Sequence, residues 1–205
     1  MLEENTTQDR IAHTAKEMML TLGIRSVSMD DIANRLGMSK KTIYQYFADK
    51  ESLVSHVFNH LIGMNCDLCK RDTKASENAI HEALLNIETV SAMFQSINKN
   101  VLHDLGKYHP QVFSTIQNHK DDYVFDLVKA NILRGQNEML YRKNLEVDIL
   151  ARYRIETLFI FFSESFKSHI HASFEAIERE VITHFIYGLV TPLGYDMIEK
   201  YKRTF

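Results

Sequence analysis

The chain has 205 residues, of which 45% are hydrophobic and 25% are charged, an ordinary composition for a globular protein of one or two domains. Its net charge of −3 at pH 7 excludes a protein that binds nucleic acid through bulk positive charge. The longest apolar run, Leu158–Phe162, is too short to cross a bilayer, and the acidic start at Glu3 and Glu4 is not typical of a signal peptide. We therefore expect a cytoplasmic protein without a membrane partner.

The scarcity of helix-breaking residues, 7 Gly and 2 Pro, favours an all-α fold of long helices. A first helix is predicted to begin after Thr6 or Thr7 and to end at Gly23. Its apolar positions recur at helical spacing, at Ile11, Ala15, Met18, Met19 and Leu22.

Two short helices are predicted next, on either side of Gly37. Ser28 and Asp31 have the spacing of a capping box, which opens a helix that continues to Leu36. Gly37 supplies a residue for a left-handed turn, and Ser39 caps the second short helix. Two short helices joined by a tight glycine turn are typical of a helix-turn-helix.

The second short helix has Ile43 and Phe47 on its predicted inner face. Its remaining side chains donate hydrogen bonds to phosphates or base edges, and none is acidic: Lys40, Lys41, Thr42, Tyr44, Gln45 and Tyr46. The alternative is a helical hairpin without a partner, whose solvated face would more often include Glu and Asp. The absence of acidic residues therefore favours DNA binding.

The run from Ser28 to Phe47, SMDDIANRLGMSKKTIYQYF, followed by ADKESL up to Leu53, resembles the DNA-binding domain of the TetR (tetracycline repressor) family. The resemblance implies a three-helix DNA-binding domain over residues 5–65 with its helix-turn-helix at 28–47. It also implies a larger helical domain for effector binding and dimerisation over residues 66–205.

The resemblance places the helix of residues 40–46 in the major groove of double-stranded DNA. Gln45 is the expected reader of a base edge because its amide can bond adenine at two points, and Lys40 is expected to reach either guanine or a phosphate. Ser28 and Lys50 are expected to clamp phosphates at helix N-termini. The full predicted DNA-binding set is Ser28, Ser39, Lys40, Lys41, Thr42, Tyr44, Gln45, Tyr46 and Lys50.

One short recognition helix reads too few base pairs to select a site in a genome, so we expect a homodimer on a near-palindromic operator. By resemblance, the protein is expected to be a repressor that a small molecule of unknown identity releases. A ligand-dependent activator or a co-repressed regulator is the alternative. A helical enzyme is more distant, because the chain lacks a phosphate-binding Gly loop, a G-x-S-x-G elbow and an H-E-x-x-H motif.

Four further helices are predicted over residues 76–104, 110–134, 146–171 and 174–202, with Pro110 at a start, Gly135 at a break and Pro192 dividing the last helix. The helix over 146–171 is apolar on all sides near residue 160, so one side is expected to face a partner subunit; a monomeric bundle is the alternative. The predicted dimer interface contains Phe161, Ile182, Phe185, Ile186 and Leu189.

An effector pocket is implied by the resemblance, although each of its candidate residues, taken singly, fits plain core better. The predicted lining is Phe94, Ile97, Val101, Tyr123, Leu127, Phe159 and Phe162, with His103 and Asp104 as nearby polar candidates.

Cys66 and Cys69 form a C-x-x-C motif with His56 and His60 upstream. On one unbroken helix the two pairs point in different directions and lie on the order of 10 Å apart along the axis. They could share a metal only if the helix broke near Gly63, so we expect no metal, no cofactor and two reduced thiols.

Overall fold

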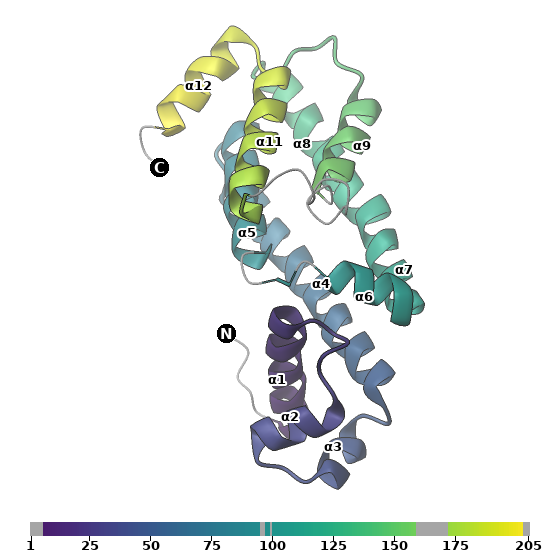
Figure 1. Ribbon diagram of the computed structural model, residues 1–205. Coiled ribbons are helices and arrows are strands. Elements are labelled where there is room, and N and C mark those ends of the chain that lie inside the picture. Colours follow the sequence, from purple (N-terminus) through teal and green to yellow (C-terminus); the bar gives the residue numbers. More distant parts are fainter. Residues whose placement is uncertain (1–5, 95–96, 99, 159–171, 203–205) are drawn as a thin grey trace. The chain divides into compact units, whose positions relative to one another are not determined.

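The computed structural model of the chain describes residues 6–94, 97–98, 100–158 and 172–202 (Figure 1). Within these ranges the regular elements are helical, apart from an isolated bridge between Tyr141 and Val190. The expected all-α fold is confirmed. No described helix has the length and apolarity needed to cross a membrane.

The chain forms two compact units. Residues up to 65 and residues 96–117 make up the first unit, and residues 66–95 and 118–205 make up the second. The first unit contains α1 (Thr7–Leu22), α2 (Met29–Leu36), α3 (Lys40–Tyr46), the first part of α4 (Lys50–Ala75), α6 (Val101–Tyr108) and most of α7 (Pro110–His119). The second contains the end of α4, then α5 (Ala79–Phe94), the π-helical turn η1 (Lys120–Val124), α8 (Phe125–Asn137), α9 (Val147–Leu158), α11 (Phe174–Leu189) and α12 (Pro192–Lys202).

Local signals set the ends of the first helices. The Thr6 hydroxyl accepts a hydrogen bond from the Asp9 backbone N–H at 3.1 Å and so caps α1. Gly23 ends α1 with a φ of 90°, and Gly37 ends α2 with a φ of 63°, in the left-handed region that favours glycine. These ends agree with the sequence predictions.

One apolar core holds the first unit together. Its fully buried side chains include Ile11 of α1, Ile32 of α2, Ile43 of α3 and Leu53 of α4. Leu105 of α6 is buried in the same core. The segment that contains α6 and the start of α7 therefore packs with α1 to α4, although it is distant in sequence. The division into DNA-binding and effector domains stays a prediction about function.

The second unit has its own core, in which α5 lies beside α8 and α11, and α9 lies beside α8 and α11 (Figure 1). Tyr141, on the connection after α8, is fully buried in it. The bridge between Tyr141 and Val190 and the hydrogen bond from Thr191 N–H to the Leu140 carbonyl (2.9 Å) tie this connection to the start of α12. The fold of this unit thus depends on contacts between distant segments.

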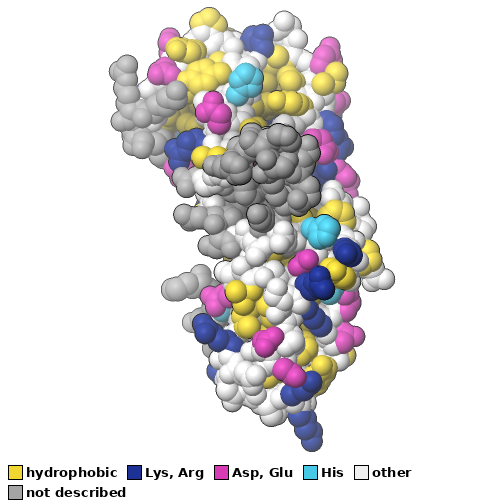
Figure 2. All heavy atoms as spheres, viewed as in Figure 1, with side chains coloured by type: hydrophobic (Ala, Val, Ile, Leu, Met, Phe, Trp, Pro, Cys, Tyr) yellow, Lys and Arg dark blue, Asp and Glu magenta, His cyan; other side chains and the backbone are white. Residues whose placement is uncertain are grey.

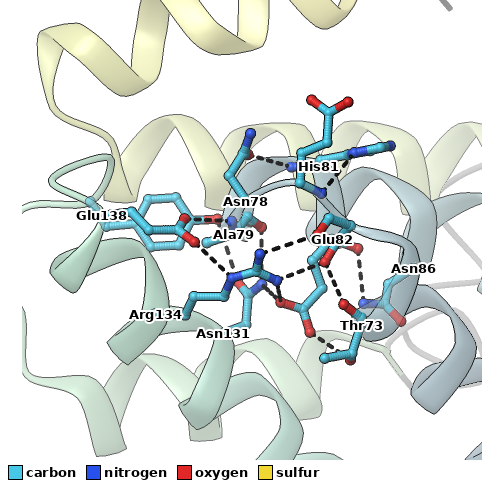
Figure 3. A network of polar contacts seen from close by, with 12 residues as sticks. Thr73, Asn78, Ala79, His81, Glu82, Asn86, Asn131, Arg134 and Glu138 are labelled. Atoms are coloured by element: carbon cyan, nitrogen blue, oxygen red, sulfur yellow. Dashed lines mark hydrogen bonds and ion pairs between the residues drawn. The ribbon is translucent and has the colours of Figure 1, made fainter.

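A network of polar contacts surrounds Glu82, a buried carboxylate on α5 (Figure 3). Thr73 donates to its Oε1 at 2.7 Å, while Asn131 and Arg134 of α8 donate to its Oε2 at 3.0 and 3.1 Å. Arg134 also donates to Glu138 at 2.8 Å. Because the carboxylate has donors on both oxygens, its burial costs far less than that of an unpaired charge.

Several predicted helix boundaries were correct and others were wrong. Pro110 starts α7 and Pro192 starts α12, as predicted. The predicted single helix over 76–104 is in fact α5 and α6, and α8 continues past Gly135 to Asn137. The remainder of the predicted 146–171 helix, beyond α9, lies outside the described residues. The helix α4 is continuous through Gly63, so the break that a metal site required does not occur there.

Gly135 is present for packing. It is buried, and a Cβ built on it would overlap the ring of Tyr141. A helix interior otherwise disfavours glycine relative to alanine by about 1 kcal/mol.

We predict that Gly135→Ala lowers the free energy of unfolding by about 1–3 kcal/mol, because the overlap with a buried ring exceeds the gain in helix propensity. Gly63→Ala is the matched control: apart from the backbone of its own helix, no described residue comes within 4 Å of a Cβ there. That variant should gain up to about 1 kcal/mol. Urea unfolding followed by circular dichroism measures both, and a Gly135→Ala protein as stable as the wild type would contradict this role of Gly135.

Candidate nucleic-acid interface

The N-terminus of α2 is a complete capping box. The Ser28 hydroxyl accepts from the Asp31 N–H at 3.2 Å, and the Asp31 carboxylate accepts from the Ser28 N–H at 2.8 Å and from its hydroxyl at 2.6 Å. These hydrogen bonds from Ser28 lower the pKa of Asp31. The hydroxyl and N–H expected to clamp a phosphate are thus already engaged within the cap.

The helix α3 is fixed by its cap and by two buried side chains. The Ser39 hydroxyl accepts from the Thr42 N–H at 3.1 Å. Ile43 is fully buried and Phe47 is 4% exposed, with its ring edge-on to His56 of α4. The predicted separation of inner and outer faces is confirmed for these two residues.

The rest of α3 faces away from this core. At 100° per residue, Gln45 lies on the order of 180° from the middle of the face formed by Ile43 and Phe47, with Lys41 next to it. Both side chains are exposed. Lys40, Tyr44 and Tyr46 are exposed on the flanks, and Thr42 is half-buried. Each predicted contact residue of α3 is therefore at least partly open to a partner.

The charge on this surface is mixed. Figure 2 shows Lys and Arg side chains at the end of the unit where Figure 1 places α3, with acidic side chains close by. Lys40 Nζ lies 2.8 Å from Oδ1 and 3.0 Å from Oδ2 of Asp30 on α2, and 5.9 Å from the centre of the Tyr44 ring. Lys41, in contrast, has no ion pair within the part of the chain that the structure describes. The two neighbouring lysines thus differ in their electrostatic surroundings.

Lys50, predicted as a phosphate clamp, has an internal partner. Its ammonium donates to the backbone carbonyl of Ile24 at 2.7 Å and is half-buried. Burial lowers the pKa of Lys50. The side chain joins the start of α4 to the connection between α1 and α2, a structural role that the sequence analysis missed because the acceptor is a backbone atom.

The segment around α6 makes polar contacts with the other helices of the first unit. Asp104, 8% exposed, accepts from the Arg25 N–H at 3.1 Å, and the Asn98 N–H donates to the Leu20 carbonyl at 2.6 Å. His109 Nδ1 pairs with the carboxylate of Glu51 in the first turn of α4. Asp104, considered above as a polar residue near a pocket, instead holds the α1–α2 connection.

Comparison with known proteins agrees with this geometry. Residues 11–57 match the model of the family described as bacterial regulatory proteins, tetR family. The chain is 25% identical over 136 residues to the HTH-type transcriptional regulator YvaF of Bacillus subtilis, a match that covers 65% of this chain and 70% of YvaF. Residues 11–57 are therefore a DNA-binding domain of the TetR type, and these matches support a TetR-family regulator.

Solved structures share the fold. A TetR-family transcriptional regulator from Cytophaga hutchinsonii superposes with a TM-score of 0.73 at 13% identity, covering 93% of this chain and 98% of that one. A protein from Saccharomonospora viridis in complex with choline superposes with a TM-score of 0.71 at 18% identity, covering 90% and 97%. The chain therefore shares the all-α fold of these structures.

The described residues predicted to line an effector pocket are divided between the two units. Val101 is buried in the core of the first unit and Ile97 packs against that core, so the structure corrects their assignment to a pocket in the second unit. Tyr123 and Leu127 are half-buried in the second unit, where the Tyr123 hydroxyl donates to the Cys66 carbonyl at 3.2 Å. The side chain of Phe94 and the residues Phe159 and Phe162 lie outside the described part.

The predicted dimer-interface residues of α11 also need correction. Ile182, Phe185, Ile186 and Leu189 are 2–8% exposed, and all four belong to the core of the second unit. Their apolar stripe is thus filled within the subunit itself, and Phe161 lies outside the described residues. The exposed large apolar side chains on α9 are Ile149, at 67%, and Tyr153, at 50%.

The capping box of this TetR-family domain gives a direct test. Ser28→Ala should lower the free energy of unfolding by about 1 kcal/mol, since it leaves the N–H of Asp31 without its acceptor. Because the pKa of Asp31 is lowered in the folded protein, its ionised carboxylate stabilises the fold at pH values above the ordinary Asp pKa of about 4. This stabilisation is lost as the pH falls through the lowered pKa of Asp31. The difference in the free energy of unfolding between wild type and Ser28→Ala should therefore become smaller at acidic pH. Ser28→Thr, which keeps the hydroxyl, is the control in thermal and urea unfolding; equal stability of all three proteins at neutral pH would contradict the cap's contribution.

Proposed function

We propose that this TetR-family transcriptional regulator is a repressor that binds a near-palindromic operator as a homodimer and is released by a small molecule bound within residues 66–205. The observation that carries the proposal is the outer face of α3. It combines an amide, hydroxyls and a cation on a helix of seven residues whose opposite face is buried. These are the groups that read base edges and hold phosphates.

We assign different roles in DNA binding to the residues on and around the outer face of α3. Gln45, farthest from the core, reads a base edge. Lys41 binds phosphate, as do Thr42, Tyr44 and Tyr46 on either side. Lys50, whose ammonium is bonded to the Ile24 carbonyl, contributes by fixing the start of α4, and Ser28 contributes by capping α2. Ser39 orients α3 through its own cap.

The proposed dimerisation follows from the small size of the reading surface, which is the outer face of α3. A helix of two turns contacts only a few base pairs, whereas two such helices about 34 Å apart read two half-sites of a near-palindrome. The exposed apolar side chains Ile149 and Tyr153 lie four residues apart on one face of α9. We assign the subunit interface to this face, in place of the buried residues of α11.

The choline-bound neighbour supports a small-molecule effector for this chain. Tyr123 and Leu127 are the predicted pocket residues that the structure describes in the second unit. In the first unit, the segment around α6 contacts both the α1–α2 connection and the first turn of α4. A shift of this segment on effector binding would thus act directly on the elements that hold α3.

The decisive experiment is a gel-shift and footprint of the purified protein on the DNA that flanks its own gene. A two-fold symmetric footprint is expected, and transcription from that DNA in vitro should fall when the protein is added. Absence of any sequence-specific binding at low salt would overturn the proposed function, and activated transcription would replace repression by the alternative mode.

We predict that Gln45→Ala and Lys41→Ala weaken binding differently. Loss of a bidentate base contact costs about 1–3 kcal/mol and relaxes preference at one position of each half-site. Loss of Lys41 should weaken operator and random duplexes alike and reduce the slope of log K against log salt by about 0.9 per subunit. Fluorescence anisotropy titrations over a salt series separate the two effects. The opposite pattern would overturn the assigned roles.

We predict that Ile149→Asp yields monomers, since a carboxylate would be buried without a partner in the proposed interface. Leu22→Asp is the matched control, because Leu22 is similarly exposed at 56% but lies on α1. Light scattering after size-exclusion chromatography gives the mass of each. An intact Ile149→Asp dimer would place the interface on another face.

A further inference from the structure

The acidic residue Asp30 lies on α2, and its carboxylate contacts Lys40 on the proposed DNA-reading face of α3. It occupies the first turn of α2, but Asp31, not Asp30, makes the capping box. The Asp30 side chain is 56% exposed, and both of its carboxylate oxygens lie within 3.0 Å of Lys40 Nζ. It therefore contributes little to the cap of α2, and its described partner is a residue of the recognition helix.

Lys40 is held on the protein surface from two sides. Asp30 binds its ammonium, and the Tyr44 ring lies one turn further along α3, with its centre 5.9 Å from Nζ. The hydrogen bond to Asp30 raises the pKa of Lys40. At the first residue of α3, this lysine is at the end of the helix that approaches base edges in helix-turn-helix complexes.

We propose that Asp30 is a specificity-determining positioning residue, which holds the Lys40 ammonium away from DNA phosphates and releases it only to acceptor atoms on a base edge. This inference rests on the proposed DNA-binding function of α3. The Asp30 carboxylate already offsets the charge of the ammonium, so the pair neutralises little phosphate charge and random DNA gains little from Lys40. The O6 and N7 atoms of a guanine offer two acceptors that can replace the carboxylate oxygens.

The competing carboxylate lowers binding to random DNA more than binding to the operator. Non-specific affinity comes almost entirely from the phosphates that cations neutralise. With Lys40 paired, Lys41 is the neighbouring cation on α3 that remains available. Discrimination between operator and random DNA is therefore larger than two unpaired lysines would give.

The test compares wild type with Asp30→Asn in salt-dependent anisotropy titrations. Two probes are used: a random-sequence 30-base-pair duplex, and a duplex selected by the wild-type protein from a random pool. Asp30→Asn should bind the random duplex about three- to tenfold more tightly, with a slope of log K against log salt steeper by about 0.9 per subunit. Binding to the selected duplex should change less, so the specificity ratio falls.

Two controls separate positioning from simple repulsion. Glu17→Gln removes one negative charge from an exposed site on α1, where Glu17 pairs with His13, and should leave the slope unchanged. In a Lys40→Met background, Asp30→Asn should lose most of its effect on the slope, because the residue acts through Lys40. An equal effect of Asp30→Asn with and without Lys40 would overturn the positioning role and leave only repulsion.

The outcomes also distinguish this inference from the proposed function. If the wild type selects no sequence and binds neither duplex, the DNA-binding role of α3 fails. If the wild type binds both duplexes and Asp30→Asn has the wild-type slope and specificity ratio, the inference about Asp30 alone fails. Asp30→Ala repeats the measurement without an amide, and circular dichroism of each variant confirms that α2 is intact.

Discussion

The burial of Ile43 and Phe47 is the constraint on which the reading surface depends. A helix of seven residues is too short to form in isolation, so α3 exists because the first core accepts these two side chains. Their position fixes the rotation of α3 about its axis and thereby places Gln45 and Lys41 outermost. The cap at Ser39 fixes where the helix begins. The exposed polar side chains of α3 are thus placed by the apolar packing of its opposite face.

The same core extends beyond the helix-turn-helix. Leu105 of α6 is buried in it, and Asp104 completes the α1–α2 connection by accepting the Arg25 N–H. A buried carboxylate that lost this donor would bear a desolvation cost of about 1–3 kcal/mol. The contact between His109 and Glu51 adds a second link to the start of α4. Residues 96–117 are therefore part of the unit that contains α3, and they contact the α1–α2 connection and the start of α4.

Sequence patterns predicted the helix-turn-helix well because its signals are local: Ser28 with Asp31, the left-handed turn at Gly37, and apolar residues four apart on α3. They failed where a residue's role is set by distant contacts. Gly135 was predicted to end a helix, but it lies within α8, where the absence of a side chain leaves room for the ring of Tyr141. The apolar stripe of α11 that includes Leu189 fits a partner subunit or its own core equally well, since periodicity shows that a face is buried and not what covers it. Val101 was assigned to a pocket for the same reason.

The few available positive charges on and near the outer face of α3 also favour the proposed dimer. Of the three lysines expected to contact DNA, Lys40 is paired with Asp30 and Lys50 is bonded to a backbone carbonyl, so Lys41 remains as a cation with open access. Each half-site therefore gains little from counterion release, and a single subunit would hold DNA weakly. Joining two such subunits makes the second contact intramolecular, which multiplies affinity only where both half-sites are spaced correctly. In the proposed dimer, weak individual contacts would thus make geometry the main determinant of site selection, in a domain whose acidic and basic residues nearly balance.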